Sequence, residues 1–205
     1  MLDRIARRNE RRRLEEEAEA QGRIPPGQSL TVKWPVLSAG PVPRFDPATW
    51  RFRIFGLVRE PVSFNWDQFR NLPWESRTND IHCVTRWSKL DNVWEGLPVR
   101  DVLARAEVDP AARYVMVHAP GYSANLSLAD LMEEDALIAF THNGAPLAPE
   151  HGGPVRLVVP KLYFWKSVKW VNGLELMPED RPGFWEQRGY NMHGDPWTEE
   201  RFGYW

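Results

Sequence analysis

The sequence predicts a single α+β domain, mixed in element order and predominantly β. Along the 205 residues, segments with strand patterns outnumber helical ones, and the sequence shows no internal repeat or low-complexity tract. The 18 prolines argue against a helical bundle and favour strands joined by structured loops. The 11 tryptophans supply large rigid surfaces for a core or a deep pocket. A chain of this length can bury a sizeable core and still carry extended termini.

Residues 1–24 are expected to form a charged helical arm, with the helix closed by Gly22. Arginines precede glutamates by four residues, as in Arg12 and Glu16, and this order opposes the helix dipole. The helix is therefore marginal unless it docks on the domain or on a partner, and a solvated charged arm is the alternative. Because the acidic half of the arm cancels its basic half and the net charge of the chain is −2, we do not expect nucleic acid as a partner.

Residues 25–180 are expected to form the domain, which opens with an extended segment. The chain from Pro25 to Pro47 is rich in Pro and Gly, and this composition predicts a segment laid over the domain surface. The side chains expected to anchor it are Trp34, Val36, Leu37 and Val42.

Several strands follow this segment. Alternation with a period of two predicts the first strand over residues 50–55. Short apolar runs predict further strands at Tyr114–His118, Ile138–Thr141, Val155–Val159 and Val168–Leu176. The dipeptide Asn143-Gly144 is typical of a tight turn between two elements.

Short helices are expected between these strands. One covers Asn65–Asn71 and stops before Pro73. A second starts near Pro98. The face that it buries is expected to consist of Val99, Val102, Leu103 and Ala106. A third begins with Ser127 as its cap and runs to about Glu134.

Residues 181–205 form an unusually aromatic tail. Its aromatic side chains are Phe184, Trp185, Tyr190, Trp197, Phe202, Tyr204 and Trp205. Leaving this surface in water costs roughly 25 cal/mol per Å² of apolar area. We therefore expect the tail to pack back on the domain, and burial in a partner is the alternative.

Cys83 is the only cysteine in the chain. It lies in the stretch Ile81–Ser88, between a turn-rich region and a helix-like one. A lone cysteine cannot form an intrachain disulfide, so its thiol serves either as a small buried hydrophobe or in chemistry.

A second segment further along the chain favours the chemical interpretation. His151-Gly-Gly-Pro-Val-Arg156, followed by Ser167-Val-Lys169, is suited to binding an anionic cofactor. Arg156 offers a planar fork for phosphate and Lys169 a point charge, while the glycines allow a ligand to approach the backbone. For each basic residue taken singly, an ordinary solvated strand charge is the alternative.

Together these motifs resemble the sulfite oxidase superfamily. The stretches His151–Pro160 and Lys166–Val171 are similar to its molybdopterin-binding core, and Ile81–Ser88 resembles its molybdenum-ligand segment. Asn143–Gly152 follows the family pattern that leads into the cofactor loop. The similarity extends from about Pro35 to Met177, in the right order and spacing. It is closest to the small stand-alone oxidoreductases related to the catalytic subunit of periplasmic methionine sulfoxide reductase.

The resemblance implies a molybdenum–molybdopterin cofactor, a mixed, predominantly β fold of the sulfite oxidase type, and the residues that hold the cofactor. Cys83 corresponds to the thiolate ligand of molybdenum, and a soft thiolate suits a transition metal. The complete cofactor-binding set that the resemblance implies is Leu37, Ser38, Ala39, Cys83, Ala119, His151, Arg156, Ser167, Val168 and Lys169.

The resemblance also implies two-electron oxygen-atom transfer. Departures from the family pattern favour the reduction of a small S-oxide or N-oxide over sulfite oxidation, because Leu37 stands where sulfite oxidases carry an arginine. The aromatic pocket expected for a neutral oxide consists of Trp87, Trp94, Tyr122, Tyr163, Phe164 and Trp165. For each of these side chains taken singly, packing in the core is the favoured alternative. His118 and Tyr122 are expected to be catalytic residues that shuttle protons near Cys83.

Two alternatives to an enzyme remain open at this point. A protein that carries or stores the cofactor without turnover would need the same basic residues. A tryptophan-rich interaction module without a cofactor would require the agreement of the motifs to be accidental.

A cytoplasmic location is expected. No apolar run approaches the length of a membrane span, and Arg7-Arg8 is not followed by the apolar stretch of a twin-arginine signal. A reducing compartment also suits a single unpaired thiol. The expected partners are a small oxide substrate and an unidentified protein that donates or accepts electrons.

Overall fold

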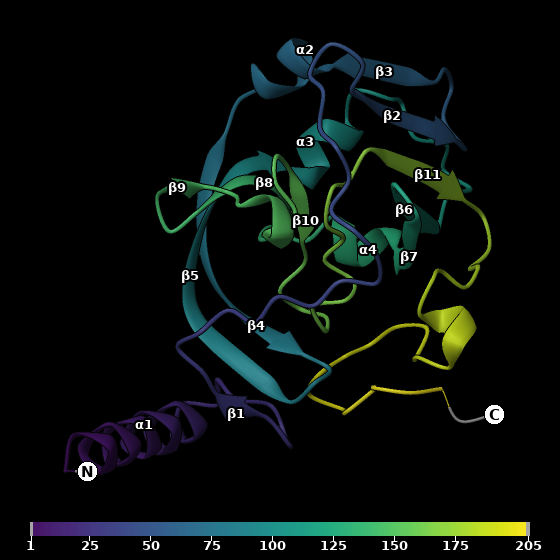
Figure 1. Ribbon diagram of the computed structural model, residues 1–205. Coiled ribbons are helices and arrows are strands. Elements are labelled where there is room, and N and C mark those ends of the chain that lie inside the picture. Colours follow the sequence, from purple (N-terminus) through teal and green to yellow (C-terminus); the bar gives the residue numbers. More distant parts are fainter. Residues whose placement is uncertain (1, 204–205) are drawn as a thin grey trace.

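Two β-sheets contribute to one main hydrophobic core (Figure 1). The computed structural model describes residues 2–203, with side chains from residue 9 onward. In this part of the chain the first sheet has six strands, in the order β1-β5-β8-β10, and β4 also pairs with β5 and β9 with β8. These strands are β1 (Ser29–Leu30), β4 (Glu75–Cys83), β5 (Trp87–Pro98), β8 (Leu137–His142), β9 (Ala145–Pro146) and β10 (Arg156–Val158).

The second sheet has five strands over the same residues, in the order β3-β2-β11-β6-β7. These strands are β2 (Arg51–Gly56), β3 (Val62–Asn65), β6 (Tyr114–Ala119), β7 (Tyr122–Ser127) and β11 (Gly173–Met177). Strand β11 is parallel to β2 and antiparallel to β6. The alternation predicted for β2 is confirmed, because Phe52 and Ile54 are buried while Arg51 and Arg53 are exposed.

The main core joins the two sheets. Strands of both sheets place fully buried apolar side chains in it, among them Ile54, Val117, Ile138, Leu157 and Leu174. The register explains part of this packing, since Leu174 lies opposite Ile54 on one side and Val117 on the other. The predicted fold class, mixed and predominantly β in a single domain, is confirmed.

The short helices lie at the predicted places. Asn65 and Gln68 form a reciprocal capping box at the start of α2 (Trp66–Arg70). All the side chains predicted to be buried by α3 (Val99–Leu103) and the turn after it are in the main core. Ser127 caps α4 (Leu128–Leu131), which ends three residues before the predicted end. The 3₁₀ helices are η1 (Pro149–His151) and η2 (Glu186–Arg188).

The region around Cys83 differs from the prediction. The residues after it are not helix-like, because Val84, Thr85 and Arg86 form a turn that connects β4 to β5, the longest strand of the first sheet. Arg86 has a φ of 70° in this turn. Cys83 therefore lies at the end of a β-hairpin, with Trp87 as its cross-strand partner.

The strand predicted over Val168–Leu176 is correct only in its second half. β11 begins at Gly173, and the residues before it form an irregular loop. Within this loop Lys169 makes an isolated bridge to Arg156, and Trp170 turns the chain with a φ of 54°. This loop contributes to the candidate site.

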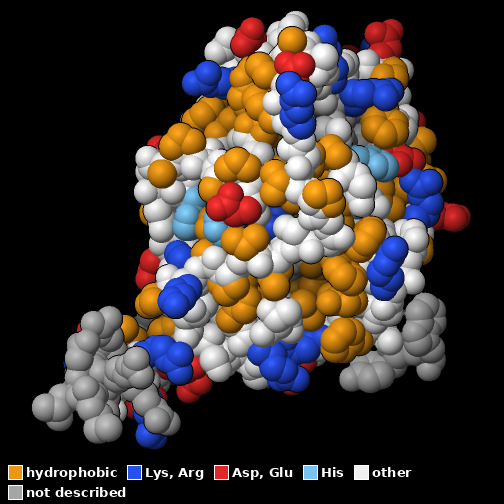
Figure 2. Space-filling view, in the orientation of Figure 1, with side chains coloured by type: hydrophobic (Ala, Val, Ile, Leu, Met, Phe, Trp, Pro, Cys, Tyr) orange, Lys and Arg blue, Asp and Glu red, His pale blue; other side chains and the backbone are white. Residues whose placement is uncertain are grey.

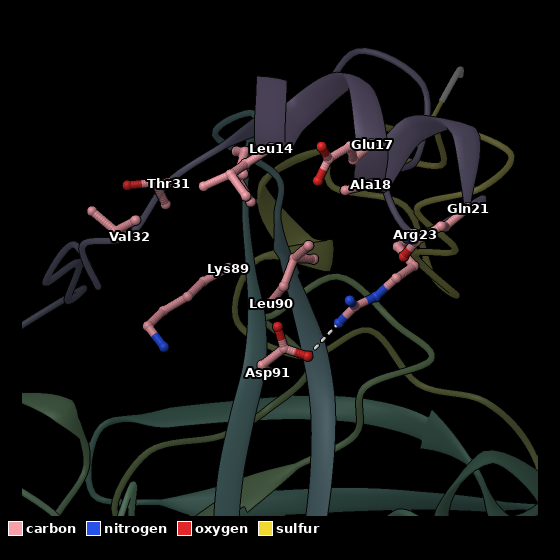
Figure 3. A pocket seen from close by; sticks show the side chains of 11 residues that line it. Leu14, Glu17, Ala18, Gln21, Arg23, Thr31, Val32, Lys89, Leu90 and Asp91 are labelled. Atoms are coloured by element: carbon pink, nitrogen blue, oxygen red, sulfur yellow. Dashed lines mark hydrogen bonds and ion pairs between the residues drawn. The ribbon is translucent and has the colours of Figure 1, made fainter. Parts of the chain in front are cut away.

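The N-terminal helix α1 (Leu2–Ala20) docks on the first sheet through its last turns. Ala18 packs with Ile24 and Leu30 in a small core of their own, and Leu90 of β5 covers it. Figure 3 shows Ala18 on the side of the helix that faces Leu90. A hollow of about 360 Å³ lies between the helix, β1 and β5.

An ion cluster fixes the chain directly after α1. The Arg23 guanidinium donates to both carboxylate oxygens of Asp80, over 2.9 and 2.7 Å. It also donates to Asp91, over 2.6 Å (Figure 3). Because Asp80 and Asp91 belong to the β4–β5 hairpin, this cluster ties the arm to that hairpin.

Residues 32–50 run across one face of the molecule, from β1 toward β2 (Figure 1). The expectation of apolar anchors is only partly correct: Trp34 is half-buried, whereas Val36, Leu37 and Val42 are exposed. Hydrophobic side chains accordingly gather on this face in Figure 2. Among the described residues, no backbone–backbone hydrogen bond joins residues 32–45 to either sheet.

The tail lies along the lower edge of the molecule in Figure 1. Tyr190 packs edge-on against Trp165, with ring centroids 5.1 Å apart, and the Tyr163 amide donates to the carbonyl of Gly194 over 2.8 Å. Trp197 stays exposed. Tyr204 and Trp205, which were predicted to belong to the packed tail, lie outside the described residues.

Candidate cofactor site

Arg156 forms the centre of the candidate site. It lies in β10 and is 1% exposed. Its Nη1 donates to the carbonyl of His151 over 2.7 Å and its Nη2 to the carbonyl of Ser167 over 2.8 Å. Burial lowers the pKa of Arg156 to about 9. Because its described partners are carbonyls and not carboxylates, an anionic ligand would balance this buried charge.

Lys169 adds a second cation beside Arg156. Its Nζ donates to the carbonyls of Leu37 and Glu150, over 2.6 and 2.7 Å, and to Ser38 Oγ over 3.0 Å. Burial, and then the charge of Arg156, lower the pKa of Lys169 to about 8. The structure thus brings the predicted residues Leu37 and Ser38 to Lys169, although they are far apart in the sequence.

His151 lies on one side of the site. Its ring stacks on Trp34, with centroids 3.8 Å apart and an interplanar angle of 17°. Its Nδ1 is buried and has no hydrogen-bond partner among the described residues. Burial is the main cause that lowers the pKa of His151. The unpaired nitrogen is therefore available to a bound group.

Ser167 and Val168 form the buried back of the site. The Val159 amide donates to Ser167 Oγ over 2.9 Å. The Leu157 amide donates to the carbonyl of Val168 over 2.8 Å. These bonds attach the loop to the end of β10, so the backbone that carries Lys169 is fixed.

Cys83 lies apart from these cations but on a connected segment. Its thiol is 6% exposed, and Sγ lies 3.1 Å from Thr85 Oγ1. Burial raises the pKa of the thiol, and the contact with Thr85 and the charge of Arg201 partly oppose this rise.

Phe164 links the two halves of the site. Its amide donates to the carbonyl of His82, next to Cys83, over 2.8 Å. Its ring lies under the Arg156 guanidinium, 4.1 Å from the ring centroid to Cζ. One residue, Phe164, therefore contacts both the hairpin end that carries Cys83 and the cationic centre, through its backbone and its ring respectively.

The structure does not place His118 near Cys83, as its predicted role as a catalytic residue requires. Its Nε2 lies 2.9 Å from Glu175 Oε2, and its ring stacks on Phe55. It lines a surface hollow of about 410 Å³ on the second sheet. Strand alternation is the reason, since Val117 and Ala119 are the core-facing residues of β6 and His118 must point the other way.

Tyr122 and Ala119 contribute to the packing behind the loop between β10 and β11, residues 159–172, which we call the cofactor loop. The Tyr122 hydroxyl donates to the carbonyl of Trp165 over 2.8 Å, and burial raises its pKa well above the ordinary value. A phenol in this state keeps its proton and is poorly suited to shuttle it. Ala119 lies in the main core as the cross-strand partner of Tyr122. Ala39 is exposed next to Ser38.

The predicted aromatic pocket is mostly packed interior. Trp94 and Tyr163 are fully buried, and Phe164 and Trp165 nearly so. Trp87 is half-buried, and its Nε1 is buried without a hydrogen-bond partner in the described part of the chain. Of the six aromatic residues, Trp87 is the cross-strand partner of Cys83.

Two charged residues of this region were missed by the sequence analysis. Lys166 is fully buried and forms an ion pair with Glu186 of the tail, with 2.7 Å between nitrogen and oxygen. Arg201, also in the tail, donates to the carbonyl of Val84, next to Cys83, over 2.7 Å. Neither contact leaves a pattern in the sequence, because each joins segments that are distant along the chain.

These residues fit an anionic, phosphate-bearing cofactor that also carries a metal. Two neighbouring cations, Arg156 and Lys169, are bound to carbonyls, and His151 Nδ1 has no partner among residues 9–203. Such a set is typical of phosphate binding. Cys83 offers one thiolate on a segment joined to the same site.

A comparison with protein families decides the identity. Residues 39–185 match the family of the oxidoreductase molybdopterin binding domain. The chain belongs to this family. It is a molybdopterin-dependent oxidoreductase of the sulfite oxidase type, and its cofactor is molybdenum–molybdopterin.

Several curated relatives share this sequence pattern. The uncharacterized oxidoreductase YuiH of Bacillus subtilis (strain 168) is 46% identical over 188 residues, which cover 91% of this chain and 95% of the relative. The catalytic subunit MsrP of the protein-methionine-sulfoxide reductase of Gluconobacter oxydans is 30% identical, over 73% of this chain and 54% of the relative. Human mitochondrial sulfite oxidase is 30% identical, over 73% of this chain and 33% of the relative.

Among solved structures, the sulfane dehydrogenase SoxCD of Paracoccus pantotrophus has a similar fold. The TM-score is 0.61 at 24% identity, and the match covers 67% of this chain and 40% of the other. Within residues 2–203, no helix of this molybdopterin-dependent oxidoreductase is long and apolar enough to cross a membrane.

Proposed function

We propose that this oxidoreductase reduces a small S-oxide or N-oxide by two-electron oxygen transfer, with a thioether S-oxide as the favoured class. The observation that carries the proposal is how the cations near the site are used. Arg156 and Lys169 are assigned to the phosphate of the cofactor, and Leu37 contributes only its carbonyl beside Lys169. Arg201 donates to the carbonyls of Val84 and Pro26, and the exposed Arg86 of the Cys83 turn donates to the carbonyl of Gly27 over 3.5 Å. A doubly charged anion such as sulfite would need further cationic donors next to the cofactor.

An uncharged oxide needs a different kind of site. Trp87 Nε1 is a buried donor that has no partner in the described part of the chain, and Trp87 lies opposite Cys83 in the hairpin. Side chains of directly paired residues lie on the same face of a sheet. A neutral donor beside the metal ligand is suited to the oxygen of an S-oxide or N-oxide, because it binds without requiring a countercharge.

The protein's own residues would hold the cofactor and exclude water from it. In this proposal Cys83 binds the metal, while Arg156, Lys169 and His151 bind the phosphate and pterin against the Ser167–Lys169 backbone. The bound cofactor supplies the two-electron redox chemistry that these side chains lack. The balance of the reaction is that the S–O or N–O bond breaks, two electrons and two protons enter, and the oxygen leaves as water.

The names of the relatives point in two directions. MsrP is described as a protein-methionine-sulfoxide reductase subunit and another relative as a sulfite oxidase. The proposal follows the first because Arg156 and Lys169 are assigned to the cofactor and Arg201 donates to two backbone carbonyls. It also retains a cytoplasmic location and a protein electron donor, which are supported only by the sequence and which cell fractionation and co-purification would test.

The first test is molybdenum content per chain, for protein made in a host that synthesises molybdopterin. We expect near-stoichiometric molybdenum in the native protein and a large loss in Cys83→Ala. Thr85→Ala is a matched control in the same turn, since it removes a contact with Cys83 but no proposed ligand. A Cys83→Ala protein that retained full molybdenum content and turnover would contradict the role given to Cys83.

The second test distinguishes the substrates. Oxidation of a reduced viologen dye would be followed with methionine sulfoxide, dimethyl sulfoxide and trimethylamine N-oxide, and sulfite oxidation with ferricyanide as the acceptor. We expect substrate-dependent rates with the oxides and a much lower rate with sulfite. A dominant sulfite activity would overturn the proposal, and a loaded protein without any substrate-dependent rate would favour a cofactor carrier.

A further inference from the structure

The C-terminal tail places a buried arginine against the turn that carries Cys83. The Arg201 Nη1 donates to the carbonyl of Val84 over 2.7 Å, and its Nη2 donates to the carbonyl of Pro26 over 3.3 Å. One guanidinium therefore joins three segments: the tail, the Cys83 turn and the chain that leads from the N-terminal arm into β1.

The position of Arg201 is fixed from several sides. The guanidinium lies over the ring of Tyr163, 4.9 Å from the centroid, and Glu199 lies 3.6 Å away. The backbone holds it too, because the Asn191 amide donates to the carbonyl of Arg201 over 3.3 Å. Arg201 is 6% exposed, so its contacts are made away from bulk water.

Two features of Arg201 point to more than packing. Its Nε is buried and has no hydrogen-bond partner among the described residues. Its guanidinium donates to the carbonyl of Val84, the residue next to Cys83, so its positive charge is fixed beside the Cys83 turn. A surface ion pair would show neither feature, since water would satisfy the nitrogen and screen the charge.

We propose that Arg201 is a positioning residue of the cofactor site: through its bond to the Val84 carbonyl it holds the Cys83 turn in place and keeps a positive charge beside the residue that binds the metal. This inference rests on the proposed role of Cys83 as the metal ligand. Groups that orient a ligand and set the charge around it tune both metal affinity and reduction potential.

The geometry explains why the charge comes from the tail. The loop after β10 carries Lys169 and binds the Arg156 side chain. It is also attached to the tail, since the Tyr163 amide donates to the carbonyl of Gly194 over 2.8 Å. The tail therefore contacts both halves of the site. A charge carried there reaches the Cys83 turn only when the tail is docked.

The test uses the cofactor-loaded enzyme and the variants Arg201→Gln and Arg201→Lys. Arg188→Gln is the matched control, because Arg188 lies in the same tail, is exposed, and packs on Phe184 instead of the Cys83 turn. The readouts are molybdenum per chain after purification, the rate of molybdenum release on dilution into chelator, and the midpoint potential of the metal followed by its paramagnetic resonance signal. Circular dichroism of each variant checks that it folds.

For Arg201→Gln we expect release of molybdenum roughly tenfold faster or more, from the loss of charge-assisted hydrogen bonds, and a lower midpoint potential, because a positive charge near the ligand favours the reduced metal. Arg201→Lys keeps the charge but not the fork, so it should release molybdenum faster while its potential stays closer to that of the native enzyme. Arg188→Gln should match the native enzyme in both readouts.

The outcomes separate this inference from the proposed function. If the native enzyme holds molybdenum and Arg201→Gln retains it equally long at an unchanged potential, the role of Arg201 is wrong while the role of Cys83 stands. If the native enzyme, folded and made in a competent host, holds no molybdenum, the proposed function fails first. If Arg201→Gln does not fold, Arg201→Lys is the deciding variant. The inference is overturned if Arg201→Lys and Arg188→Gln both release molybdenum at the native rate and have the native midpoint potential.

Discussion

At the scale of single residues, the site is built from charges that are buried and bound to carbonyls. Arg156 and Lys169 each donate to backbone oxygens from distant segments, and burial lowers the pKa of both side chains. Burying a cation without a carboxylate costs free energy that the carbonyls repay only in part. Binding of the anionic cofactor therefore stabilises the folded protein as well as completing the site.

His82 gives a prediction about stability at acid pH. It is 4% exposed beside Cys83, with Nδ1 2.8 Å from Ser88 Oγ, and burial lowers its pKa to about 4. Unfolding restores a pKa of about 6.5, so the unfolded chain binds the extra proton first. Stability should be complete above about pH 6.5 and fall by about 2 to 3 kcal/mol as the pH drops to about 4.

Urea unfolding of the native protein and of His82→Gln, at a series of pH values from 7.5 to 4, would measure this effect. As the pH falls across that window, the free energy of unfolding should decrease more for the native protein than for His82→Gln. Parallel curves for both proteins would show that His82 does not take up the proton on unfolding.

Sequence reasoning proposed site residues where a local motif contains them, and the structure brings several of these together. Arg156, Lys169 and Ser167 lie together in the structure, and Cys83 is joined to them through Phe164. It misplaced His118, whose direction is set by strand alternation. It did not find Arg201, because the carbonyl that this side chain binds belongs to the other end of the domain.

At the scale of elements, the β4–β5 hairpin was the main feature that the sequence did not reveal. The first part of β4 is polar, and the burial of β4 becomes continuous only in its last three residues. The hairpin is defined by its ladder with β5 and by the turn at Arg86, and neither produces a hydrophobic period. The strands β2 and β6 were predicted because one of their faces lies in the core.

The ion cluster at Arg23 gives a prediction for the docking of the N-terminal arm. Arg23→Gln removes the bonds to Asp80 and Asp91, which join the arm to the hairpin. Because the arginine is about one third exposed, we expect a loss of only about 1 kcal/mol in the free energy of unfolding. Amide hydrogen exchange should rise in residues 21–31 and stay unchanged in the second sheet.

Arg12→Gln is the control for this experiment. It removes the exposed i,i+4 pair with Glu16 on the same arm, where both side chains are mostly in water. Its exchange rates in residues 21–31 should match those of the native protein. Equal protection in Arg23→Gln and Arg12→Gln would mean that the apolar contacts of Ala18 and Leu90 dock the arm without the ion cluster.

At the scale of the whole molecule, one buried ion pair joins the tail to the cofactor loop. Lys166 and Glu186 are both fully buried, and the Lys166 ammonium also donates to Asn125 and to the carbonyl of Met192. The Trp165 indole donates to the same Glu186 carboxylate over 2.9 Å. The cofactor loop, β7 and the tail therefore meet at one charged group.

Breaking this pair should destabilise the fold strongly. Glu186→Gln leaves the Lys166 ammonium buried without its countercharge, and we expect the free energy of unfolding to fall by about 3 to 5 kcal/mol. The double variant Lys166→Met with Glu186→Leu should lose less, because it leaves no buried charge. The measurement is urea unfolding at neutral pH.

Arg59→Gln is the control, since its pair with Glu107 is exposed on both sides and should contribute less than about 0.5 kcal/mol. A double variant as unstable as Glu186→Gln would assign the cost to lost hydrogen bonds at Asn125 and Trp165 instead of to the unpaired charge.

The chain that crosses the face between β1 and β2 bears on how this enzyme matures. In the part of the chain that the structure describes, residues 32–45 share no backbone–backbone hydrogen bond with either sheet. Side-chain contacts hold them instead: Trp34 stacks on His151 and packs against Trp94, and Phe45 packs on Trp66. Lys169 adds bonds to Leu37 and Ser38. These contacts can open while every strand ladder remains intact. We therefore expect the folded apoprotein to accept the cofactor without prior unfolding of its strands.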